Sequence, residues 1–125
     1  MIVIVIVGIL SAVALPSFLS QRGKAESTEA VQQIGLMLKE AKIMHLEGVS
    51  AADIASNLNA SKPTTGKFDY TASNKSTTDV CVAAEANSKS SLANETNKHL
   101  GGRLLLASQQ PEINSTLVST APTCT

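Results

Sequence analysis

The chain opens with a long run of residues in which no side chain is charged. The run MIVIVIVGILSAVALPSFL fills positions 1–19, and the chain turns polar immediately afterwards at Ser20, Gln21 and Arg22. As an α-helix this run is about 28 Å long, close to the roughly 30 Å hydrocarbon core of a bilayer. Because it is apolar on every side, such a helix must lie in lipid or among other helices.

Three other structures are possible for this run. The β-branched stretch 2–7 is locally typical of a buried strand, but the whole run is too long for one strand. A buried helix of a globular domain needs apolar partner surface, and the remaining chain is poor in it. A cleaved signal peptide is disfavoured, because no basic segment precedes the run and no clear cleavage site ends it before Gln21. We therefore expect residues 1–20 to form a transmembrane or filament-core helix segment.

The remaining chain, 21–125, has the length and charge of one small domain. Its ten basic and ten acidic side chains balance and are interspersed from Arg22 to Glu112. The sequence has no basic stripe that would indicate a nucleic-acid partner. It also has no acidic tail that would indicate a cationic partner. Ser, Thr, Asn and Ala are abundant and the apolar strings are short, so the core is expected to be thin.

An amphipathic pattern continues the first helix into this domain. Apolar residues recur at three- and four-residue steps, while charged residues such as Glu26 lie mostly elsewhere; the stripe consists of Ala30, Val31, Ile34, Met37, Leu38, Ala41 and Met44. Gly48 is a suitable residue to end the helix. The pattern predicts one helix from the N-terminus to about residue 47, apolar in its first part and amphipathic in its second.

Gly8 and Pro16 interrupt the apolar part of this helix. Pro16 has no N–H to donate to the carbonyl of Ala12, and Gly8 adds backbone freedom. The segment between them is therefore expected to be the weakest part of the helix, either as a simple kink or as a place where it opens.

After the helix, the pattern predicts a short helix and several strands. Ser50 and Asp53 form a capping box for a helix to about Leu58, and a loop follows to Gly66. Strands are expected at 67–71, 79–86 and 103–108, and weakly at 115–120, with a long polar connection over 87–102. This order indicates an α+β fold with a small antiparallel sheet packed on the long helix.

Cys81 and Cys124 are the two cysteines of the chain. Their spacing matches no zinc or redox motif, so the alternatives are two unrelated thiols or one disulfide that pins the C-terminal tail. We favour the disulfide, which would contribute roughly 4 kcal/mol on the chain-entropy model. It would also indicate an oxidising, extracytoplasmic compartment.

The sequence contains no recognisable catalytic or cofactor motif. His45 and His99 have no carboxylate or cysteine partner at ligand spacing, and Gly101-Gly102 alone is too weak a signal for a phosphate site. Four N-x-S/T sequons begin at Asn59, Asn74, Asn94 and Asn114. In a chain so rich in Ser, Thr and Asn, chance explains them more readily, and glycosylation is kept as the minor alternative. We expect neither an enzyme nor a bound metal or cofactor.

The segment IVIVGILSAVALPSFLSQ, residues 4–21, resembles the N-terminal helix of bacterial type IV pilins, type IVa-like. The resemblance rests on Gly8, on Ala14-Leu15-Pro16 and on the polar turn at Ser20-Gln21. It covers about the first twenty residues closely, and beyond them only the order of elements and the C-terminal cysteine pair, which resembles the family's disulfide-bounded loop. It implies the pilin fold.

The resemblance also implies residues ahead of Met1. A similar mature pilin begins with a Phe or similar residue, typically N-methylated, and carries a Glu a few positions later, which neutralises the N-terminus of a neighbouring subunit. Neither residue has an equivalent in this sequence, so Met1 is expected to be an internal position.

By this resemblance the chain is the major subunit of a type IV pilus, a filament that supports adhesion, surface motility and in some cases DNA uptake. Its partners would be identical copies, the inner membrane before assembly and the pilus assembly machinery, and its final location the cell surface. The residues expected to pack in the filament core are Ile4, Ile6, Ile9, Leu10, Leu15, Phe18 and Leu19. In the filament, residues 8–16 are expected to lose helical hydrogen bonds.

Alternatives to a major pilin remain open. The chain is also compatible with a minor pilin or with a pseudopilin of a type II secretion system. From another class, it is compatible with a monomeric membrane-anchored binding module whose contact surface is the polar connection 87–102. Topology is contested as well, since Arg22 and Lys24 after the run favour a cytoplasmic domain by the positive-inside rule, whereas the cysteine pair favours the opposite side.

Overall fold

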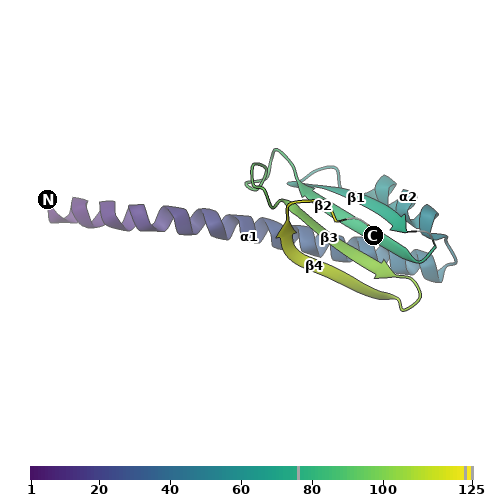
Figure 1. Cartoon of the computed structure of the whole chain (residues 1–125). Coiled ribbons are helices and arrows are strands. Elements are labelled where there is room, and N and C mark those ends of the chain that lie inside the picture. Colours follow the sequence, from purple (N-terminus) through teal and green to yellow (C-terminus); the bar gives the residue numbers. More distant parts are fainter. Residues whose placement is uncertain (76, 123, 125) are drawn as a thin grey trace.

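A computed structural model describes residues 1–75, 77–122 and 124, with only the helical backbone described at positions 16, 19 and 20. The elements are α1 (Ile2–Leu46), α2 (Ala51–Ser61), β1 (Phe68–Lys75), β2 (Asp79–Ala86), β3 (His99–Leu105) and β4 (Gln110–Val118). The first half of α1 projects from a head in which the strands lie on its second half (Figure 1). The α+β class and the single long N-terminal helix are thus confirmed.

The four strands form one antiparallel sheet in the order β1-β2-β3-β4. One face of the sheet packs on α1, and the other points away from it (Figure 1). The capping box at the start of α2 is confirmed, because the Ser50 hydroxyl accepts from the Asp53 amide N–H at 3.3 Å. Helix α2 continues to Ser61, three residues beyond the predicted end at Leu58.

Three of the strand predictions need correction. Strand β1 runs from Phe68 to Lys75, four residues beyond its predicted end. Strand β3 begins at His99, so the segment 99–102 is not part of a loop, and β4 begins at Gln110. The early start of β3 was not predicted because Gly101 and Gly102 have no side chains, so they do not show the apolar–polar alternation of a strand. A Cβ at Gly102 would lie 2.7 Å from the Ile34 side chain of α1, and a Cβ at Gly101 would lie 2.6 Å from Pro122. The two glycines therefore let α1 and the C-terminal tail approach opposite faces of the sheet.

The core lies between the sheet, α1 and α2. The predicted stripe of α1 is buried at Ala30, Ile34, Met37, Leu38 and Ala41, while Val31 and Met44 are partly buried. It packs against buried residues of α2 and of the inner sheet face, chiefly Ile54, Leu58, Val80, Val82, Ala84, Leu100 and Leu104. The helix period of 3.6 and the strand period of two therefore meet across a single apolar layer.

The expected disulfide is present. Cys81 of β2 is bonded to Cys124, with their Cα atoms 5.6 Å apart. Because Pro122 also packs against Gly101, the tail is held on the sheet face that points away from α1. This excludes the alternative of two unrelated thiols.

Candidate functional site

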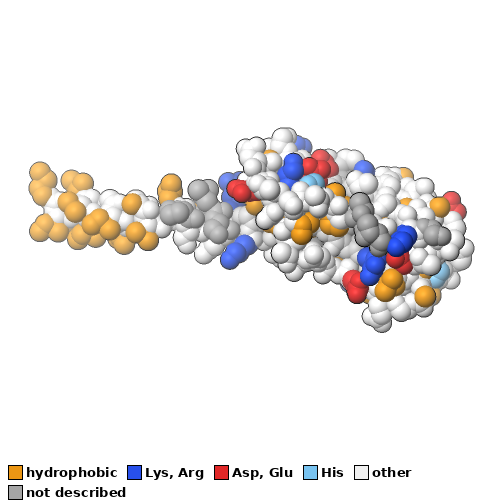
Figure 2. Space-filling view, viewed as in Figure 1, with side chains coloured by type: hydrophobic (Ala, Val, Ile, Leu, Met, Phe, Trp, Pro, Cys, Tyr) orange, Lys and Arg blue, Asp and Glu red, His pale blue; other side chains and the backbone are white. Residues whose placement is uncertain are grey.

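The first part of α1, residues 2–18, projects from the head and is largely exposed among the described residues (Figure 1). Every large apolar side chain described between Ile2 and Phe18 is more than half exposed, from 51% for Ile6 to 76% for Ile2. Six of the residues expected in a filament core belong to this set: Ile4, Ile6, Ile9, Leu10, Leu15 and Phe18. The side chain of the seventh, Leu19, lies outside the described part. Hydrophobic side chains cover this projecting segment (Figure 2).

Within the described residues, no helix has a stretch of the length and apolarity that a membrane crossing requires. The transmembrane assignment of residues 1–20 therefore stays a prediction.

The backbone of α1 is helical through both Gly8 and Pro16. A Cβ added at Gly8 would meet no atom within 4 Å. One turn later the Ser11 hydroxyl donates to the Val7 carbonyl at 2.7 Å. The ring of Pro16 is outside the described side chains. In a single copy α1 stays helical, and the predicted loss of hydrogen bonding concerns only the assembled state.

The exposed apolar surface continues on the second half of α1. Leu36, Ile43 and Leu46 are each more than half exposed, although the opposite stripe of the same helix is buried under the sheet. Residues seven apart lie on the same side of a helix, so Leu36 and Ile43 share one face. The helix therefore presents apolar surface away from its own head along both halves.

A buried carboxylate lies where the free half of α1 meets the head. Glu26 is 3% exposed and pairs with Lys67 at 2.9 Å and with Arg22 at 3.5 Å. The Ser90 hydroxyl donates to it at 2.7 Å, and Ser91 donates through both its amide and its hydroxyl at 3.0 Å. Glu26 thus ties α1 to the start of β1 and to the loop 87–98.

The charge of Glu26 is stabilised by these contacts. Burial alone would raise its pKa, but hydrogen bonds from Lys67, Ser90 and Ser91 outweigh burial and lower the pKa from 4.5 to about 2. The prediction that Glu26 lies away from the buried face of the helix is wrong. Its position four residues before Ala30, in line with the buried stripe, was the signal that could have identified it.

Glu26→Gln is expected to lower the free energy of unfolding by about 2 kcal/mol at pH 7, because Lys67 loses its buried partner. A folded-state pKa below the unfolded value means that the stabilisation is complete above pH 4.5 and is lost as the pH falls towards 2. Urea unfolding of the full chain in detergent between pH 2 and pH 7 measures both effects. Glu95→Gln, at an exposed position of the same loop, is the control; an equal loss in both variants would contradict a special role for Glu26.

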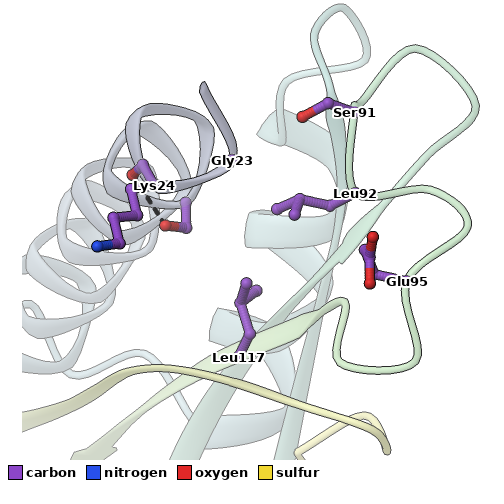
Figure 3. A pocket seen from close by; sticks show the side chains of 7 residues that line it. Gly23, Lys24, Ser91, Leu92, Glu95 and Leu117 are labelled. Carbon is purple, nitrogen blue, oxygen red and sulfur yellow. Dashed lines mark hydrogen bonds between the residues drawn. The ribbon is translucent and has the colours of Figure 1, made fainter. Parts of the chain in front are cut away.

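A cleft of about 520 Å³ opens beside this carboxylate. Leu92 and Leu117 point from the head towards Gly23 of α1 (Figure 3). The hydroxyls of Ser27 and Ser91 are engaged by the Lys24 carbonyl and by Glu26. The cleft is therefore an apolar gap with charged residues at its rim, and its lining contains no pair of a nucleophile and a base.

The other chemical candidates are dispersed. His45 lies in the last turn of α1 and His99 at the start of β3. In the described part of the chain, no group of three or more His, Cys, Asp or Glu side chains is placed to hold a metal ion. The carboxamide of the Asn59 sequon is engaged, donating to the Ala72 carbonyl at 2.7 Å and accepting from its N–H at 2.9 Å.

Comparisons of the chain with protein-family models, with curated proteins and with solved structures find no match. The pilin resemblance of residues 4–21 therefore stays a prediction.

Proposed function

We propose that the chain is the major structural subunit of a type IV pilus and polymerises through the first half of α1. One observation carries the proposal: residues 2–18 of this helix carry no charge, and the described part of the chain leaves all of their large apolar side chains more than half exposed. An isolated subunit in water would expose all of these side chains. Surrounding the helix with equivalent helices removes them from water without any change in the head.

The second half of α1 supports the same arrangement. Leu36, Ile43 and Leu46 extend the exposed apolar surface into the head, on the side that the sheet leaves open. Helices in the centre with heads outside would bury both halves of α1. Contact between two different surfaces, repeated along a screw axis, produces an open filament and not a closed ring.

The proposed route places the subunit in the inner membrane before assembly and on the cell surface afterwards. Lipid and a bundle of apolar helices are both apolar surroundings, so moving from one to the other costs little hydrophobic free energy. The Cys81–Cys124 disulfide supports a head on the oxidising side of that membrane. The disulfide is stronger evidence for the side of the head than Arg22 and Lys24 are. The positive-inside rule compares basic residues on both sides of the helix, and a basic leader ahead of the helix would change that comparison.

Electron microscopy of sheared surface material, with mass spectrometry of the fibres, tests the proposal. Thin filaments composed mainly of this chain are the expected result. Filaments in which the chain is scarce would favour a minor pilin, and an intracellular role in secretion without surface filaments would favour a pseudopilin. A subunit that stays monomeric in detergent and membranes and binds a ligand saturably would favour a binding module and overturn the proposal.

A filament map would also test the weak segment of α1. Residues between Gly8 and Pro16 are expected to lose helical hydrogen bonds in the filament, because Pro16 donates none and neighbouring helices compete for the freed carbonyls. The quantity to measure is the rise per residue between Gly8 and Pro16, which should exceed the helical value of about 1.5 Å. Unbroken helix through the segment would contradict this prediction and leave the filament proposal intact.

A further inference from the structure

We draw no further inference here: the strongest candidate, the cleft at the base of the head between Gly23 of α1, Leu92 of the loop 87–98 and Leu117 of β4, has apolar walls, and nothing in the structure shows what covers them.

Discussion

Ile9→Lys and Leu10→Lys are each expected to abolish the proposed filaments while leaving the head folded. Both side chains are more than 60% exposed in the single copy, so the substitution should cost the isolated fold little. In a bundle of apolar helices each copy would instead bury an unpaired ammonium. That burial costs about 3 kcal/mol per subunit or more, and it recurs at every step of the filament.

Counting filaments in sheared surface material by electron microscopy measures this effect. Ile9→Leu keeps the apolar surface and should assemble normally, and Asn94→Lys adds the same charge to an exposed loop of the head. Immunoblots of the membrane fraction show whether the lysine variants are still present as subunits. Wild-type numbers of filaments from Ile9→Lys would mean that this half of α1 does not lie in the filament core.

Removing the disulfide is expected to have the next largest effect. The double substitution Cys81→Ala and Cys124→Ala should lower the free energy of unfolding by roughly 2–4 kcal/mol, because the long loop between the two positions is no longer closed in the unfolded chain. Without the bond, the described tail still has the contact of Pro122 with Gly101 on the sheet. Such a loss is a large share of the stability of a small domain.

Chemical denaturation of the full chain in detergent, with and without a reducing agent, provides the measurement. The reductant should destabilise the wild-type chain by a similar amount and leave the double variant unchanged. A difference below about 1 kcal/mol between variant and wild type would show that the cross-link adds little to the fold.

Local signals predicted most elements of this fold. The apolar stripe from Ala30 to Ala41 and the Ser50–Asp53 capping box act within a few residues along the chain, and both are found as expected. The start of β3 was missed, because Gly101 and Gly102 are selected by what approaches them from α1 and from the tail. No periodicity of side chains marks such positions.

The candidate sites divide in the same way. The uncharged run is visible in the sequence, whereas the Glu26 cluster joins residues that lie 41 and 64 positions apart. The pairing of Asp69 with Glu85 and of Glu85 with His99 depends on strand register, which short sequence patterns do not specify when a strand contains two glycines. Contacts between segments that are distant in the sequence therefore could not be predicted from it.

From sequence alone came the uncovered apolar helix, the α+β class and the pairing of the cysteines, since each depends on residue type and spacing along the chain. The tertiary structure decided which carboxylate is buried at Glu26, why two glycines lie in a strand, and which polar side chains pair across neighbouring strands. The physical reason is that burial and charge pairing depend on neighbours in space, and only the packed sheet and helix bring those neighbours together.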